Sequence, residues 1–244
     1  MPRRRLPAAC ALLVLVGCAR SERPVDATLS ADGITSLRAL VDRGDLTVHG
    51  TSDTGFVLQG TSAGMGRNET RAALHESGNR VDLSADGAAA VLTSTSVYRR
   101  AWVTLDLAGP AQLDLDLQVD RGSVDVEQVE GTHTITADRI TSVQLAGSMD
   151  LHATSGGMDV DVWPADDGQV QLDSSAGDVV LRLAWGRPYD VEVIGDPAYD
   201  MQIEDLGFQG TFSEPGYFSG TVGDGSIPVS VYVNGGSFEL LESL

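Results

Sequence analysis

The chain has 244 residues, and its 35 acidic side chains outnumber its 16 basic ones, which gives a formal net charge of −19. A surface of this charge repels phosphate backbones, which argues against nucleic acid as a partner. Both cysteines, Cys10 and Cys18, lie near the start of the chain, so everything after them is without a thiol for a disulfide or a metal site.

Residues 1–17 have the layout of an export signal, because three arginines precede an apolar run that is too short to cross a bilayer as a helix. The tetrapeptide that follows this run, Leu-Val-Gly-Cys at residues 15–18, resembles the lipobox of bacterial lipoproteins. In that motif lipid is attached to the cysteine and the chain is cleaved just before it. The resemblance implies lipidation of Cys18 and removal of residues 1–17. The alternative is an ordinary signal in which the cysteine has no role.

After Cys18 comes a polar stretch without hydrophobic periodicity, ARSERPVDATLS. Such a composition is typical of flexible linkers. We therefore expect residues 18–36 to contain the lipidated cysteine and a flexible tether that holds the domain off the membrane. Residues 37–244 are expected to form a single domain.

Alternation of apolar and polar residues begins at Leu37 and includes the run DRGDLTVHG. It is interrupted at residues 61–80, where Asn68 is a suitable cap for a short helix over residues 69–75 that ends at Gly78. Extended structure then resumes, and WVTLDLAGP predicts a strand that runs into a Gly-Pro turn.

The centre of the chain, residues 112–183, is a ladder of short alternating runs separated by glycine turns. Residues 113, 115, 117 and 119 are aliphatic and project to one face, while the polar residues between them project to the other. The run DRGSVDV at 120–126 echoes DRGDLTV at 42–48, and such self-similarity is typical of stacked repeats. The pattern predicts an all-β fold, a β-solenoid with one helical insertion, with a β-sandwich as the alternative.

The last third of the chain is rich in aromatic residues. Two final strands, at 229–233 and 237–240, are joined by Asn-Gly-Gly, which predicts a hairpin. An open solenoid end needs a cover, so we interpret the aromatic residues as an end cap in preference to a carbohydrate- or peptide-binding face. These residues are Trp185, Tyr189, Tyr199, Phe208, Phe212, Tyr217 and Phe218.

The sequence contains only weak signals for catalytic or metal-binding residues. The pairs Asp114/Asp116 and Asp159/Asp161 are the ones to test for polysaccharide cleavage. Residues spaced i, i+2 also lie together on the solvent-exposed face of an ordinary strand. The four histidines, His49, His75, His133 and His152, lack ligand spacing. Calcium could be bound by stacked aspartates, but solvated carboxylates are the preferred interpretation. The aspartates concerned are Asp159, Asp161, Asp166, Asp167, Asp173 and Asp178. We therefore predict no catalytic, cofactor-binding or metal-ligating residue.

The order of these parts resembles a bacterial family described as putative adhesins, built around a domain of unknown function with a β-solenoid fold. The resemblance covers residues 37–241 and implies surface attachment without transferable catalytic residues. We expect a non-enzymatic, lipid-anchored cell-envelope protein that meets the membrane through its lipid and binds an extracellular or envelope ligand. A polysaccharide-active β-helix enzyme and an envelope scaffold or regulatory protein are the alternatives. Ala19, where many inner-membrane lipoproteins have Asp, favours the outer membrane over the inner membrane.

Overall fold

The computed structural model describes residues 18–243, and in this range the chain is all-β with one helix, α1 (Glu69–Glu76). The export signal expected at residues 1–17 lies outside the described residues. No helix within 18–243 is long and apolar enough to cross a membrane. The strands are β1 (Ala19–Ser30), β2 (Ser36–Val41), β3 (Gly44–Thr51), β4 (Gly55–Gly66), β5 (Asn79–Asp86), β6 (Ala89–Ser96), β7 (Ala101–Pro110), β8 (Asp114–Val119), β9 (Ser123–Glu127), β10 (Glu130–Ala137), β11 (Arg139–Ala153), β12 (Met158–Pro164), β13 (Val170–Ser174), β14 (Val179–Ala184), β15 (Tyr189–Gly195), β16 (Met201–Ile203), β17 (Gln209–Glu214), β18 (Tyr217–Thr221), β19 (Ile227–Val233) and β20 (Phe238–Ser243).

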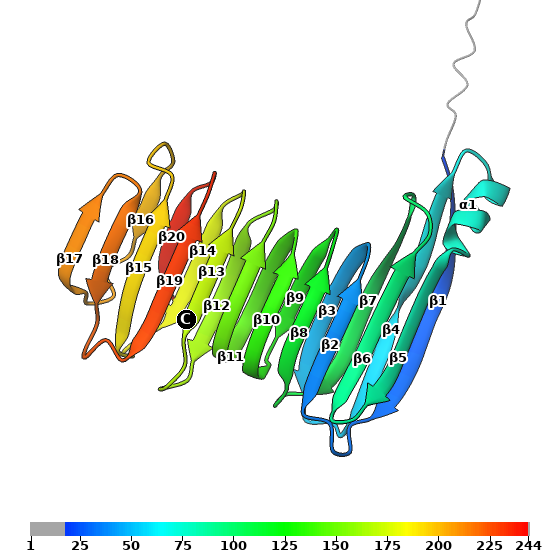
Figure 1. The fold of residues 1–244 in the computed structure, drawn as a ribbon, viewed down its shortest axis with the longest axis horizontal. Coiled ribbons are helices and arrows are strands. Elements are labelled where there is room, and N and C mark those ends of the chain that lie inside the picture. The colour runs from blue at the N-terminus through cyan, green and yellow to red at the C-terminus, as the bar shows by residue number, and fades with distance from the viewer. Residues whose placement is uncertain (1–17, 244) are drawn as a thin grey trace, which may run out of the picture.

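Most of the strands form two parallel ladders along the molecule, and antiparallel strands extend them at both ends, β4, β1 and β5 at one and β18 and β17 at the other (Figure 1). The first ladder has the spatial order β6, β2, β8, β10, β11, β13, β19 and β15. The second has the order β7, β3, β9, β11, β12, β14, β20 and β16. The long strand β11 joins both, because residues 139–143 pair with β9 and residues 146–153 pair with β10. Short turns along one edge connect each strand to its counterpart in the other ladder.

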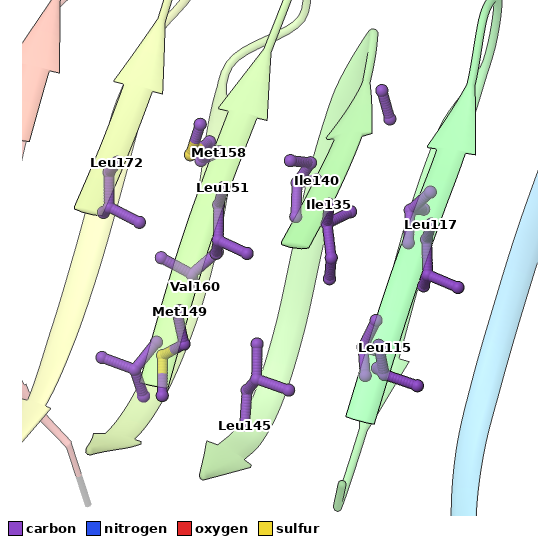
Figure 2. Close-up of a cluster of buried hydrophobic side chains, with 14 of the residues drawn as sticks. Leu115, Leu117, Ile135, Ile140, Leu145, Met149, Leu151, Met158, Val160 and Leu172 are labelled. Atoms are coloured by element: carbon purple, nitrogen blue, oxygen red, sulfur yellow. The ribbon is translucent and has the colours of Figure 1, made fainter. Parts of the chain in front are cut away.

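A continuous aliphatic core lies between the two ladders. Figure 2 shows its centre, where buried side chains of both ladders, among them Leu115 and Ile135 of the first and Ile140 and Val160 of the second, belong to one cluster. The predicted register is confirmed, since residues 113, 115, 117 and 119 are buried and residues 114, 116, 118 and 120 are exposed. Each buried Leu or Val contributes roughly 1.5–3 kcal/mol, which explains why the alternation specifies the inward face.

The two similar runs at residues 42–48 and 120–126, which we call the two copies of the glycine-turn unit, lie directly on one another. β3 pairs in parallel with β9, with Leu46 opposite Val124 and Val48 opposite Val126. The Asp45 carboxylate accepts hydrogen bonds from the backbone amide and the hydroxyl of Ser123 at 3.1 and 2.8 Å. The sequence echo therefore marks neighbouring rungs of one ladder.

Residues 19–30 form a strand, so the prediction of a flexible tether is wrong. β1 pairs antiparallel with β4 over its whole length, from Ala19 opposite Gly66 to Ser30 opposite Gly55. Val25, Ala27 and Leu29 pack against the core, and their period-two spacing is the strand signal that the many polar residues obscured. Pro24 is compatible with this position because β1 is an edge strand. The folded domain consequently starts well before residue 37.

The predicted helix is confirmed. Asn68 adopts an extended conformation, and its side-chain oxygen accepts a hydrogen bond from the Arg71 amide at 2.9 Å. This bond satisfies one of the amides that have no partner in the first turn. α1 packs against β4, and glycines at positions 64 and 66 permit this approach because a β-carbon there would meet helix backbone at 2.2 and 2.5 Å.

The predicted terminal hairpin is wrong. β19 pairs with β13 and β15, whereas β20 pairs with β14 and β16. The Asn234-Gly235-Gly236 turn therefore carries the chain from one ladder to the other, in the same way as the other turns along this edge. Local turn chemistry predicts a reversal of the chain, but it does not decide which strand becomes the partner.

Candidate binding surface

The outward side chains of five adjacent strands form two rows across the C-terminal part of the first ladder. The strands are β11, β13, β19, β15 and β18, of which β18 is antiparallel to β15. Neighbouring strands are about 4.8 Å apart, so each row extends over about 19 Å. We call these ten residues the polar-aromatic face. The first row is Asp150, Gln171, Ser230, Glu192 and Ser219, and the second is His152, Asp173, Tyr232, Ile194 and Tyr217.

A cavity of about 310 Å³ lies over the centre of the polar-aromatic face. Tyr232 and Ile194 line it and are 49% and 43% exposed. Asp173 and Glu192 line the same cavity. Because strand residues alternate in direction, Val231 and Val193 between these positions are buried in the core. The backbone of a packed sheet thus holds the exposed groups in place.

Polar neighbours orient both carboxylates of the cavity. The Tyr217 hydroxyl donates a hydrogen bond of 3.1 Å to Glu192 Oε1. His152 Nδ1 lies 3.3 Å from Asp173 Oδ2. The Tyr217 ring is also tilted against the Phe212 ring, with centroids 5.8 Å apart. Exposed aromatic rings therefore continue from the cavity towards the end of the sheet.

This arrangement suits a ligand that has both apolar faces and hydroxyl or amine groups. Tyrosine offers a flat apolar ring and a polar tip, and carboxylates accept hydrogen bonds from hydroxyl groups. A sugar ring has this combination of surfaces. The carboxylates of the face, in a chain of net charge −19, disfavour anionic ligands.

The aromatic residues of the last third divide into two groups. Tyr189 and Phe218 are buried, Phe208 packs edge-on against Phe218 at 5.3 Å between ring centroids, and these residues cover the core. Burial raises the pKa of Tyr189 to about 12, and its hydroxyl donates to the Ala184 carbonyl at 3.0 Å. Of the other residues expected in the cap, Trp185, Tyr199 and Phe212 remain exposed and Tyr217 is half-buried against Phe212. The end-cap interpretation thus describes the buried group only.

The aspartates considered for catalysis lie on exposed surfaces with partners of their own. Asp116 pairs with Arg38 at 3.1 Å, and Asp114 accepts a hydrogen bond from the Thr132 amide at 2.8 Å. Asp159 pairs with Arg182, and Asp161 accepts a hydrogen bond from the Ser243 hydroxyl at 2.7 Å. Asp159 lines a cavity of about 320 Å³ together with Arg139 and Asp178, whereas Asp161 does not line it.

The aspartates considered for calcium do not converge. Asp166 pairs with Arg187, and Asp173 lies beside His152. Asp178 accepts hydrogen bonds from the amide and hydroxyl of Ser237, which lower its pKa below the usual range. Within residues 18–243 no group of three or more His, Cys, Asp or Glu side chains is placed to hold a metal ion.

The histidines have different environments. His49 lies between Asp106 and Glu127, at 3.4 and 3.1 Å. His133 is buried on β10, and burial lowers its pKa. Its Nε2 atom lies 2.9 Å from the Ala146 carbonyl oxygen. The four histidines therefore do not form a common site.

The structure places Cys18 at the exposed start of the domain, one residue before β1. The thiol is accessible there for a modification, and its lipidation remains a prediction.

The polar-aromatic face was missed in the sequence because its residues come from five separate strands. One signal was available. Tyr232 in VSVYV and Ile194 in DVEVI occupy outward positions that are otherwise polar in these runs. Exposed apolar side chains indicate a binding surface when they lie next to one another, and the pairing of β15 with β19 brings Ile194 beside Tyr232.

No protein-family model matches the sequence, and no curated protein matches it. Among solved structures, the chain is similar to a putative cell adhesion protein from Clostridium sporogenes ATCC 15579, with 8% identity, a TM-score of 0.49 and coverage of 91% of this chain and 100% of that chain. It is also similar to a putative adhesin from Bacteroides fragilis NCTC 9343, with 7% identity, a TM-score of 0.31 and coverage of 91% and 98%.

A third similar structure is a putative lipid binding protein from Parabacteroides distasonis ATCC 8503, with 12% identity, a TM-score of 0.27 and coverage of 92% of this chain and 95% of that chain.

Proposed function

We propose that this protein is a non-enzymatic, lipid-anchored protein of the bacterial cell envelope whose polar-aromatic face binds an extended neutral or cationic polymer. A polysaccharide is the first candidate. The observation that carries the proposal is the exposed pair Tyr232 and Ile194, which lines one cavity together with the carboxylates of Asp173 and Glu192. Rigid aromatic anchors beside polar groups are common at recognition surfaces.

The fold supports an extended ligand. We interpret the two parallel ladders as the faces of a β-solenoid, in which each turn of chain adds one rung. A row of about 19 Å on such a face matches several consecutive units of a polymer better than one small molecule. The candidate catalytic carboxylates Asp116 and Asp159 are paired with arginines on exposed strands, which supports binding over cleavage.

Anchoring is proposed through Cys18. The Leu-Val-Gly-Cys motif supports lipidation, and the exposure of Cys18 before β1 provides access. Ala19 at the following position favours the outer membrane. In this arrangement the lipid is attached directly to a folded strand, since β1 replaces the expected tether.

Binding is tested with Tyr232→Ala, and the matched control is Tyr199→Ala because both tyrosines are 49% exposed. We would measure retardation of the protein in native gels that contain neutral polysaccharides such as dextran or glucomannan, and binding to oligolysine as the cationic probe. Loss of at least about tenfold in affinity is expected for Tyr232→Ala only, since an aromatic anchor is worth about 2 kcal/mol or more. Equal binding by both variants and the wild type would contradict the proposed face.

The anchor is tested by expressing the chain with its own signal, as wild type and as Cys18→Ser. A lipid-sized gain in mass and partitioning into detergent should occur in the wild type and disappear in the variant. Identical, water-soluble behaviour of the two proteins would refute the anchor and leave a secreted binding protein.

A further inference from the structure

Four arginines gather around one cavity beside α1, although the chain as a whole is strongly acidic. Arg67 and Arg71 come from the start of the α1 region, and Arg99 and Arg100 come from the turn between β6 and β7. Together with His75 and Tyr98 they line a cavity of about 400 Å³, which we call the arginine pocket. Thirteen arginines follow residue 17, so this one site holds almost a third of them.

The guanidinium groups of the arginine pocket are not used by the fold. All four arginines are exposed, and within residues 18–243 none of them makes an ion pair. No carboxylate lines the pocket. On α1 itself, Glu76 is already engaged by Arg23 at 2.8 Å, which leaves Glu69 as the remaining acidic residue of the helix. The site consequently has a clear excess of positive charge.

The pocket is built on an ordered frame. The Tyr98 ring packs on His75 with ring centroids 5.0 Å apart, and His75 Nδ1 contacts the Met65 carbonyl oxygen. Gly78 allows the Tyr98 ring to lie close, because a β-carbon there would be 2.5 Å from it. Arg43 also donates from its guanidinium to the Arg99 carbonyl at 3.3 Å, which holds the β6–β7 turn. The arginine side chains therefore project from a defined support.

Three exposed aliphatic side chains belong to the same segments of chain as the arginine pocket, and we call them the apolar rim. Met65, Leu74 and Val97 are 38%, 52% and 78% exposed, and each is the chain neighbour of a residue that lines the pocket. Exposed aliphatic side chains beside basic groups are typical of surfaces that rest at the boundary between headgroups and acyl chains.

The arginine pocket lies at the corner of the molecule where the proposed lipid anchor is attached. Ala19 pairs with Gly66, which is one of the residues that line the pocket, so Cys18 lies at the same corner of the molecule. Figure 1 shows α1 beside the start of β1 at this end of the sheet. A lipid on Cys18 would hold this corner, and not the polar-aromatic face at the other end, against the bilayer.

We propose that the arginine pocket and its apolar rim form a membrane-contacting surface that binds the phosphate groups of anionic phospholipids, an inference that rests on the proposed anchoring through Cys18. Guanidinium groups bind phosphate through paired N–H donors. An acyl chain combined with a basic patch gives firmer membrane attachment than either alone. The surface thereby sets the orientation of the domain on the membrane, and the acidic rest of the domain faces away from the membrane.

The test uses the full chain carrying Cys18→Ser, so that an acyl chain does not contribute to binding. Cosedimentation is measured at low ionic strength with vesicles of phosphatidylglycerol and phosphatidylcholine, and with vesicles of phosphatidylcholine alone. In this background the four pocket arginines are replaced by Gln (Arg67→Gln, Arg71→Gln, Arg99→Gln and Arg100→Gln). The control has the same change in charge elsewhere (Arg38→Gln, Arg80→Gln, Arg182→Gln and Arg187→Gln), and thermal melting confirms that both variants fold.

We expect the pocket variant to lose at least about tenfold in affinity for the anionic vesicles, because each basic residue near an anionic surface is worth roughly a factor of five. The control variant should bind like its parent. Equal losses in both variants, equal binding to phosphatidylcholine, or displacement by inorganic phosphate at matched ionic strength would each overturn the proposal, the last by showing a small-anion site. Anchoring through Cys18 is measured separately by mass, so failure of the anchor and failure of this surface give different results.

Discussion

Gly122 lies directly against Gly44, and a β-carbon on Gly122 would be only 1.8 Å from the Gly44 carbonyl oxygen. Gly122 also has a φ of +139°, a conformation that residues with side chains rarely adopt. The contact joins the two copies of the glycine-turn unit, in which the Gly44 amide donates to the Arg121 carbonyl at 2.9 Å. The turns can therefore stack at strand spacing only while this position has no side chain.

The first prediction concerns this stack. Gly122→Ala should lower the free energy of unfolding by about 3 kcal/mol or more, because backbone strain adds to a clash that no side-chain rotation relieves. Urea denaturation measures the change. Gly33→Ala is the control, since Gly33 has a φ of +75° but no atom within 4 Å of the added carbon. It should cost about 1–2 kcal/mol from strain alone, and equal losses in the two variants would contradict the steric explanation.

The second prediction separates a strand from a tether in residues 19–30. β1 forms an antiparallel ladder with β4 over twelve residues. Its bonded amides should exchange hydrogen slowly, because opening them requires the edge of the sheet to separate. Hydrogen exchange followed by mass spectrometry provides the measurement, and the exposed turn at residues 166–167 is the internal reference. Exchange in 19–30 as fast as in an unfolded peptide would refute the strand.

The third prediction concerns Asn79, whose buried amide nitrogen joins three strands. It lies 3.1 Å from Ser62 Oγ, 3.3 Å from the Ala63 carbonyl and 3.0 Å from the Trp102 carbonyl. Asn79→Ala should destabilise the protein by about 2 kcal/mol, because buried acceptors on β4 and β7 lose their donor. Thermal or urea unfolding measures the loss. The control Asn234→Ala, in an exposed turn, should stay within about 0.5 kcal/mol of the wild type.

The fourth prediction concerns the dependence of stability on pH. His133 is buried, and desolvation lowers its pKa in the folded state, although the Ala146 carbonyl and the charge of Asp114 act in the opposite direction. The unfolded state, with a histidine pKa of about 6.5, binds the proton more readily. The free energy of unfolding should therefore decrease as the pH falls below about 6.5, down to the pKa of the folded state.

The matched variant for this effect is His133→Leu, which has no group that titrates in this range. Its unfolding free energy, measured in urea at a series of pH values between neutral and mildly acidic, should have a smaller slope than that of the wild type. The comparison concerns slopes, so a uniform change in stability of the variant does not affect it. Identical slopes would show that His133 does not contribute.

Several elements followed from local sequence. The helix at 69–76 was predictable because a capping Asn, a run of helix-forming residues and a terminal glycine lie at the required spacing. The inward positions of residues 113–119 followed from period-two alternation. β1 was missed because its small and half-buried apolar residues give a weak alternation, and only pairing with β4 makes the strand stable.

By itself, the sequence determined which residues form strands in most of the chain, which side chains face the core, and where glycines allow the turns to stack. Tertiary structure alone decided the order of the strands. The pair β2 and β3 lies between β6/β7 and β8/β9, and the pair β19 and β20 lies between β13/β14 and β15/β16. The physical reason is that short Val- and Leu-rich strands are nearly interchangeable as partners, so pairing is selected by long-range packing. The polar-aromatic face and the arginine pocket both depend on that choice, because each is assembled from segments far apart in the chain.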